Sequence, residues 1–175
     1  MGDRLRRLKL RAADALMATI PRPVPSRAAL QSCKIISHRG EHDNVRVMEN
    51  TLPAFARARE AGVWGIECDI RWTADLVPVV CHDPTAQRVF GHPAAIGALA
   101  FDELRAELPL IPTLAEVIEA TGGETHLMLE LKAEPFPDPQ RQREVLARTL
   151  AGLIPGRHYH VLGLDPGVFE LVSFL

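Results

Sequence analysis

The sequence has few cysteines, almost no net charge and no long apolar run. Its three cysteines, Cys33, Cys68 and Cys81, are odd in number and lack the spacing of a metal-binding motif, which favours buried thiols in a reducing cytoplasm. A formal net charge of −2 gives no reason to expect nucleic acid as a partner. No apolar run is long enough for a secretory core or a membrane span. These absences predict a cytoplasmic protein, with peripheral contact to the inner membrane surface as an alternative location.

The first thirty residues differ in character from the rest of the chain. Five cations crowd the first eleven residues: Arg4, Arg6, Arg7, Lys9 and Arg11. Apolar residues recur there at helical spacing: Leu5, Leu8, Ala12, Leu16 and Ile20. The pattern predicts a basic amphipathic helix and a Pro-rich linker over residues 1–30, followed by one domain over residues 31–175. Two interpretations stay open, a helix that rests on an anionic membrane surface or one that caps the domain or frays.

From residue 34 onward the sequence alternates between strand and helix patterns. We expect strands over residues 34–38, 65–72, 77–82, 126–132 and 169–174. We expect helices over residues 52–61, 101–108, 113–120 and 141–153, the first of them capped by Asn50 or Thr51. This alternation is typical of parallel βα units, and 47% apolar with 24% charged residues is ordinary for a soluble globular domain.

Acidic residues stand in pairs on two of the expected strands. Glu67 and Asp69 are two residues apart, so both side chains face the same side of a strand. Glu130 and Lys132 repeat that spacing on a later strand. A hard divalent cation, Mg²⁺ or Ca²⁺, would suit three such carboxylates and water. The alternative is a salt-bridge cluster that includes Arg39 and holds no metal.

Two histidines fall at the ends of expected strands. His38 ends one strand, with Arg39 beside it, and His82 ends another. One neutral imidazole can remove a proton while a protonated one donates to a leaving oxygen. Strand ends are where a β/α barrel keeps its chemistry, so these side chains are candidates for acid–base catalysis on a phosphodiester.

Several sequence blocks in register together resemble one family. They are His38-Arg39-Gly40, Glu49-Asn50-Thr51, Ile66-Glu67-Cys68-Asp69, Thr73-Ala74-Asp75, Val79-Val80-Cys81-His82-Asp83, Ile111-Pro112-Thr113-Leu114 and Leu129-Glu130-Leu131-Lys132. From about Lys34 to the C-terminus their order and spacing closely resemble the glycerophosphodiester phosphodiesterase family. The resemblance implies a TIM barrel that hydrolyses glycerophosphodiesters to glycerol 3-phosphate and an alcohol with a divalent metal.

The resemblance also implies residue roles. Glu67, Asp69 and Glu130 would be metal ligands, His38 and His82 would be the general base and acid in either order, and Arg39 with Lys132 would hold the phosphate. The alcohol of the substrate and the choice between Mg²⁺ and Ca²⁺ stay open.

The length of the chain sets a further expectation. A (β/α)₈ barrel typically takes ~250 residues, with ~200 as a lower end. We therefore expect an α/β fold of TIM-barrel type that is truncated after about five strands, with open sheet edges that invite self-association. Two alternative functions remain: a lysophospholipase D or sphingomyelinase D-like phosphodiesterase that acts on lipids, and an inactive truncated remnant.

Overall fold

The computed structural model describes residues 15–20, 23–121 and 123–175, and contacts divide the chain into two units, Met1–Cys33 and Lys34–Leu175. The cations of the expected basic helix, Arg4 to Arg11, lie outside the described residues. The first unit contains α2 (Arg27–Gln31), which begins where the Ser26 hydroxyl accepts a hydrogen bond from Ala29 N. Among the helices of the described ranges, none combines the length and the apolar composition that crossing a membrane requires.

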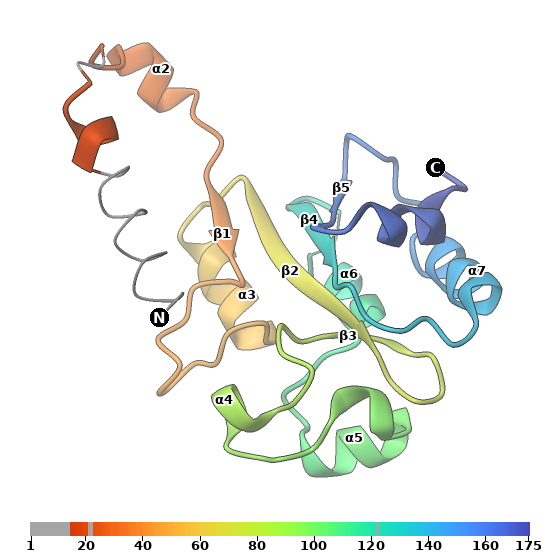
Figure 1. Cartoon of the computed structure of the whole chain (residues 1–175). Helices are drawn as coiled ribbons and strands as arrows, with labels where there is room; N and C mark the ends of the chain where they lie inside the picture. The colour runs from red at the N-terminus through yellow and green to blue at the C-terminus, as the bar shows by residue number, and fades with distance from the viewer. Residues whose placement is uncertain (1–14, 21–22, 122) are drawn as a thin grey trace. The chain divides into compact units, whose positions relative to one another are not determined.

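The second unit is built on one five-stranded sheet, β1 (Ile36–His38), β2 (Gly65–Trp72), β3 (Pro78–Val80), β4 (His126–Leu131) and β5 (Tyr159–Leu162). Four strands run parallel in the order β1-β2-β4-β5, and β3 pairs antiparallel with β2 (Figure 1). Crossover helices connect the parallel strands: α3 (Leu52–Glu60), α6 (Leu114–Thr121) and α7 (Pro139–Thr149). This strand–helix repeat is that of a TIM barrel, as the sequence predicts.

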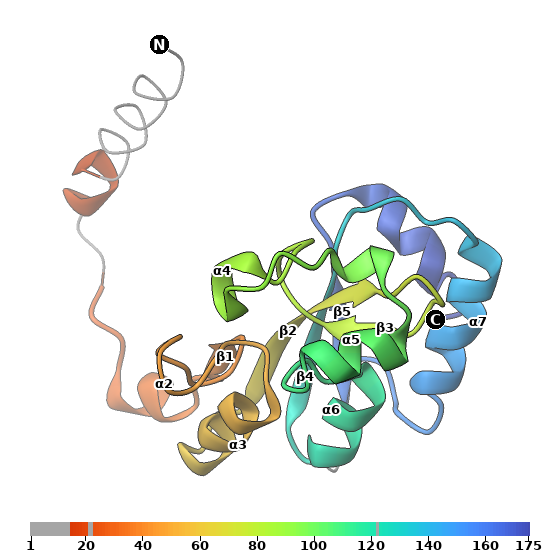
Figure 2. The ribbon, with the colours of Figure 1, turned by 90° about the horizontal axis from the view of Figure 1, so that it is seen from below.

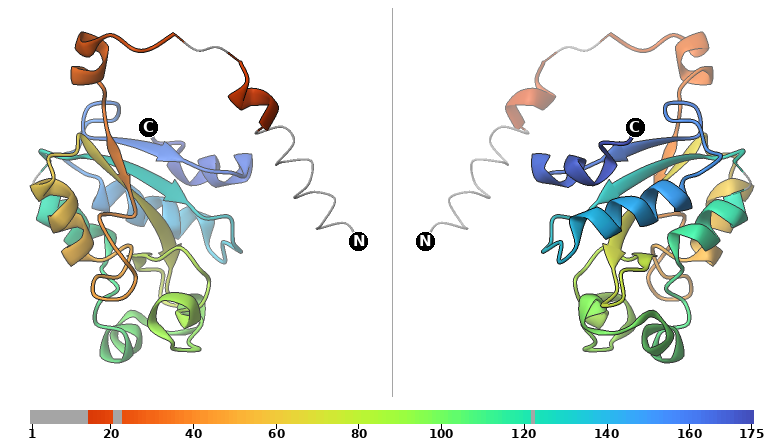
Figure 3. Two further views of the ribbon diagram at one scale, coloured as in Figure 1. Left: turned by 90° about the vertical axis from the view of Figure 1, so that its left-hand side faces the viewer. Right: turned by 90° about the vertical axis from the view of Figure 1, so that its right-hand side faces the viewer.

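The three crossover helices pack against one face of the sheet (Figure 3). The side chains of β2 and β4 alternate, so every second one joins this apolar core, as Ile66, Cys68 and Ile70 do on β2. Phe55 of α3 and Leu146 of α7 are buried in the same cluster. The residues between them on β2 therefore face the opposite side, which corresponds to the interior of a barrel.

A second, smaller apolar cluster lies under the segment that follows β3. This segment holds α4 (Gln87–Phe90), the 3₁₀ turn η1 (Ile96–Ala98) and α5 (Phe101–Glu107), beyond the carboxyl end of β2 (Figures 1 and 2). Val79, Cys81, Ile96 and Leu104 form part of its core. The cluster thereby anchors the chain on both sides of His82.

Several predicted elements are confirmed. The strand over 65–72 is β2, and the helix predicted after Asn50 or Thr51 is α3, with Thr51 as its N-cap. The helices predicted over 101–108 and 113–120 are α5 and α6, and the strand predicted over 126–132 is β4. The self-association predicted for open sheet edges stays a prediction.

The third predicted strand was wrong in direction and length. It was expected over residues 77–82 as a parallel barrel strand, but β3 covers only Pro78–Val80 and runs antiparallel to β2. The connection from Trp72 to Pro78 is short, and a parallel pairing needs a crossover of a dozen residues or more. The chain instead reverses in a tight turn, in which Leu76 has φ 64°.

The fifth predicted strand was placed wrongly. Residues 166–172 form the 3₁₀ helix η2 (Pro166–Val172), which begins at Asp165, whose carboxylate accepts from Gly167 N. The fifth strand is instead Tyr159–Leu162, paired with β4 from Leu127 onward. An apolar run alone does not distinguish a strand from a buried helical segment. Residues 159–162 are a strand because they pair with β4, and residues 166–172 are not paired in the sheet.

Candidate active site

Three carboxylates meet on the barrel-interior face of the sheet. Glu67 and Asp69 come from β2 and Glu130 from β4, where Asp69 and Glu130 are direct partners in the strand register. One oxygen from each lies within 4.8 Å of the others. Asp69 is fully buried and Glu67 nearly so. The acidic cluster predicted from the sequence is therefore assembled by the pairing of two parallel strands.

The cluster has the donor set of a hard cation. Within the described part of the chain, Glu67 Oε1 and Asp69 Oδ1 are buried oxygens that accept no hydrogen bond. Lys132 Nζ lies 2.7 Å from Asp69 Oδ1 but without hydrogen-bond geometry, and it donates to Glu130 Oε1 at 2.7 Å. Burial and the neighbouring Asp69 charge raise the pKa of Glu67 to about 7. Three carboxylates gathered at a buried position, one of them with a raised pKa, fit a divalent cation, and Mg²⁺ and Ca²⁺ prefer such oxygens.

A tight turn after β1 brings Arg39 to the cluster. Arg39 and Gly40 have φ values of 59° and 80°, and Arg39 N donates to Glu67 O at 3.0 Å while Arg39 O accepts from Asn50 N at 3.0 Å. A Cβ on Gly40 would lie 2.8 Å from the backbone of Ala54, so only glycine fits there. The turn directs the guanidinium back to Asp69, with Nε 3.1 Å from Oδ2.

Glu49 lies at the centre of an ion-pair network that the sequence analysis assigned no role. Its carboxylate accepts from Arg39 at 2.9 Å, from Arg88 at 2.6 and 2.9 Å, and from the Asn44 amide at 2.7 Å. The hydrogen bonds from Arg88 hold the pKa of Glu49 well below its usual range. Arg88 also pairs with Asp83. Glu49 thus fixes Arg39 beside Asp69 and links it to the loop that carries His82.

The two predicted catalytic histidines occupy different settings. His38 is exposed, and its Nε2 lies 3.7 Å from Glu67 Oε2. His82 is half-buried, and its Nδ1 lies 2.6 Å from Asp83 Oδ1, which leaves Nε2 for other partners. His38 therefore contacts the acidic cluster directly. His82 is tied to it through the backbone, since Cys81 N donates to Asp69 O at 2.9 Å.

The seven predicted site residues lie on or next to four strands: His38 and Arg39 at the end of β1, Glu67 and Asp69 within β2, Glu130 and Lys132 at the end of β4, and His82 just after β3. Three residues that support the site were not predicted: Arg88, which pairs with Glu49 and Asp83, and Arg71, which donates to the His82 carbonyl and pairs with Glu134. Glu49 and Asp83 stand inside the sequence blocks that resemble the family. The sequence therefore showed two carboxylates at these positions, but not the arginines with which they pair. Arg88 carries no local signal, because its partner Glu49 lies 39 residues away.

Comparison with known proteins identifies the family of the chain. The sequence model of the glycerophosphoryl diester phosphodiesterase family matches residues 38–159, which is more than half of the chain. The chain belongs to this family. The matched range begins at His38 and contains all seven site residues.

Curated members of the glycerophosphodiester phosphodiesterase family match the same region. Glycerophosphodiester phosphodiesterase 1 of Rattus norvegicus is 40% identical over 116 residues, which is 55% of this chain and 34% of the relative. A glycerophosphodiester phosphodiesterase of Caldanaerobacter subterraneus is 36% identical over 111 residues, covering 57% of this chain and 45% of the relative. The chain thus spans between a third and a half of the length of these relatives.

A solved structure of the family has the same fold. The glycerophosphodiester phosphodiesterase of Thermotoga maritima superposes with a TM-score of 0.66 at 26% identity, over 80% of this chain and 58% of that one. The α/β fold of TIM-barrel type predicted from the sequence is confirmed. The superposed region is a little over half of the length of that chain.

Proposed function

We propose that this site hydrolyses glycerophosphodiesters to glycerol 3-phosphate and an alcohol with the help of a divalent cation. The observation that carries the proposal is the trio Glu67, Asp69 and Glu130, with two buried oxygens that accept no hydrogen bond from the described residues. Two cations of the chain contact this trio, Arg39 at Asp69 Oδ2 and Lys132 at Asp69 Oδ1. Family membership supports the same substrate class.

The three carboxylates would hold Mg²⁺ or Ca²⁺, which when bound would neutralise phosphate charge and polarise the scissile bond. Arg39 and Lys132 would then be released from the carboxylates to contact phosphate oxygens. Arg39 has a partner outside the trio, since it donates to Glu49 at 2.9 Å, whereas Lys132 Nζ lies 2.7 Å from both Glu130 and Asp69, within the trio. Fixed positive groups at the phosphate stabilise the charge that develops on its oxygens.

His38 and His82 would transfer the protons. The glycerol 2-hydroxyl would attack phosphorus after losing its proton to one imidazole, and the other would protonate the leaving alcohol oxygen. Water would then open the resulting cyclic phosphate to glycerol 3-phosphate. The hydrogen bond of His82 Nδ1 to Asp83 fixes the ring and leaves Nε2 for this transfer. His38 is exposed and lies 3.7 Å from Glu67, within reach of a substrate on the cluster.

The test is release of glycerol 3-phosphate from glycerophosphocholine by the purified chain with Mg²⁺, with Ca²⁺ and with EDTA. We expect metal-dependent release, and we expect His82→Ala to lower turnover at least ~100-fold while binding of Ca²⁺ or Mg²⁺, measured by calorimetry, persists. His92→Ala is the matched control, since His92 is a solvent-accessible histidine paired with Glu107.

Three results would contradict the proposal. Near-wild-type turnover in His82→Ala would remove His82 from the mechanism. Faster release of choline from lysophosphatidylcholine than from glycerophosphocholine would favour the lipid phosphodiesterase alternative. Absence of release with either cation at every pH would favour the inactive remnant.

A further inference from the structure

Arg71 is a buried arginine on the same face of β2 as the acidic residues. It stands two positions after Asp69 and is only 8% exposed. Its Nε donates to the backbone carbonyl of His82 at 2.9 Å. A guanidinium that is taken out of water and directed at a main-chain oxygen fixes that segment of chain, because each lost hydrogen bond would leave a buried group unsatisfied.

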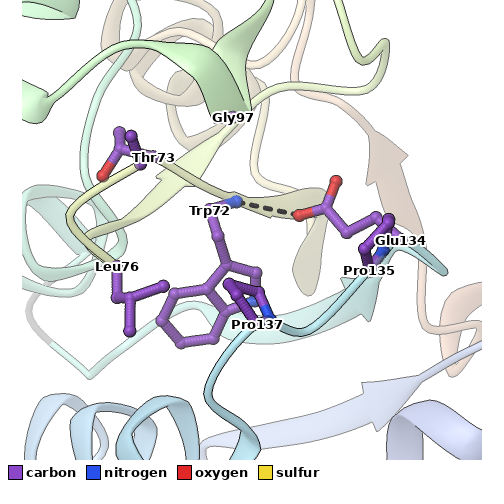
Figure 4. Close-up of a pocket in the computed structure, with 8 residues that line it drawn as sticks. Trp72, Thr73, Leu76, Gly97, Glu134, Pro135 and Pro137 are labelled. Atoms are coloured by element: carbon purple, nitrogen blue, oxygen red, sulfur yellow. Dashed lines mark hydrogen bonds between the residues drawn. The ribbon is translucent and has the colours of Figure 1, made fainter.

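Glu134 completes this arrangement from the segment that follows β4. One of its oxygens accepts from Arg71 Nη1 at 2.5 Å, and the other accepts from Trp72 N at 3.1 Å. Figure 4 shows the carboxylate directed at the main chain of Trp72, in a pocket that Pro135 and Pro137 also line. Glu134 therefore joins the chain after β4 to the end of β2 and fixes the orientation of the Arg71 fork.

The backbone of His82 depends on this pair for its position. The β3 ladder ends at Val80, and the next amide, Cys81 N, bonds to Asp69 O at 2.9 Å. Beyond Cys81 the chain leaves the sheet, and the Arg71 guanidinium holds the carbonyl of His82. The imidazole itself is held by Asp83. Arg71 and Cys81 thus tie both sides of His82 to the strand that carries Asp69.

We propose that Arg71 and Glu134 are positioning residues that set the distance and direction of His82 from the acidic cluster. The proposal rests on the proposed function, since it concerns the alignment of the His82 ring with a substrate at that cluster. A reacting group displaced by 1 Å can cost about 100-fold in rate. Lysine cannot replace the guanidinium here, because its single ammonium lacks the fork that reaches His82 O and Glu134 together.

The test compares Arg71→Met, Arg71→Lys and Glu134→Gln with Arg105→Met as the matched control. Arg105 also pairs with a glutamate, Glu116, at 2.6 Å, but it does so between α5 and α6. We expect both Arg71 variants to lower kcat by ~10- to ~100-fold with unchanged KM. We expect a smaller loss for Glu134→Gln, whose amide oxygen can still accept one of the two bonds. Arg71→Lys keeps the buried charge and serves if Arg71→Met does not fold.

A second readout does not require turnover. Imidazole ¹H–¹⁵N spectra of the folded variants should show His82 ring signals shifted or broadened in Arg71→Met and Arg71→Lys, with those of His38 unchanged. In Arg105→Met both sets should match the unsubstituted chain. If the unsubstituted chain releases no glycerol 3-phosphate, the proposed function fails, and these spectra alone decide the positioning role.

Three results would overturn the positioning role of Arg71 and Glu134. A raised KM with unchanged kcat would make Arg71 a substrate-contacting residue and overturn the proposal. Equal losses in Arg105→Met would reduce the effect to general destabilisation and overturn it too. Unaltered His82 signals in the Arg71 variants would contradict it whatever the activity.

Discussion

The two faces of β2 are buried to nearly the same degree but stabilised in different ways. Ile66, Cys68 and Ile70 face the helices and fill an apolar core. Glu67 and Asp69 alternate with them on the other face, at 7% and 0% exposure. Burial of apolar area stabilises the first face, whereas burial of charge on the second costs free energy unless partners compensate.

The charged face is a candidate cation site because its carboxylates are only partly compensated by neighbouring cations. Arg39 and Lys132 lie against Asp69, yet two carboxylate oxygens among the described residues still accept no hydrogen bond. A face shaped only for stability would satisfy these oxygens or replace them with apolar groups. The comparison teaches that burial stabilises the helix-covered face, whereas the barrel-interior face carries charges whose burial costs stability.

The largest effect is expected where the charged face is changed without changing its shape. Asp69→Asn removes one central charge, and we expect turnover to fall at least ~1000-fold because cation and phosphate stabilisation is worth several kcal/mol. Loss of Mg²⁺ or Ca²⁺ affinity by calorimetry should accompany it. Asp102→Asn, on the exposed surface of α5, is the control. Substantial turnover in Asp69→Asn would show that the two faces are not separated in role.

The complementary change is made on the apolar face of β4. Leu129 is 2% exposed and stands beside Glu130 in sequence. Leu129→Ala should lower the free energy of unfolding by about 2–5 kcal/mol, through lost burial and a residual cavity, as measured by urea denaturation. The fraction that remains folded at low temperature should keep its metal affinity. The half-exposed Leu110→Ala should change the stability by less than about 0.5 kcal/mol. An equal loss at both positions would contradict the assignment of Leu129 to the core.

The smallest expected effect is a pH dependence of stability, caused by the buried carboxylate of Glu67 on the charged face. Burial raises the pKa of Glu67 from 4.5 to about 7, so the folded chain binds this proton more tightly than the unfolded chain. Its stabilising contribution is complete below about pH 4.5 and is lost as the pH rises through 7. In EDTA, the melting temperature of Glu67→Gln should therefore decline less over this interval than that of the unsubstituted chain.

The control for this pH dependence is Glu60→Gln, an exposed glutamate at the end of α3. Its melting temperature should follow the unsubstituted chain at every pH. Saturating Ca²⁺ or Mg²⁺ should remove the decline in the unsubstituted chain, since a bound cation favours the ionised carboxylate. An identical decline in Glu67→Gln would assign the pH dependence to other groups.

Much of the fold could be predicted because its determinants are local. β2 and its two faces follow from side-chain alternation, and α3 begins at a threonine that caps it. The third and fifth strands could not be predicted correctly in this way. β3 reverses because its connection is too short for a crossover, and β5 is selected by its ladder to β4 rather than by its own composition.

The sequence by itself determined the candidate site residues, because Glu67 with Asp69, Glu130 with Lys132 and the strand-end histidines have the spacing that places them on one face or at one edge. The tertiary structure alone decided which distant residues pair around the candidate site. Arg88 meets Glu49 across 39 residues and Arg71 meets Glu134 across 63. Such pairs form only when the sheet brings distant strand ends together, and no periodic pattern within one segment encodes that meeting.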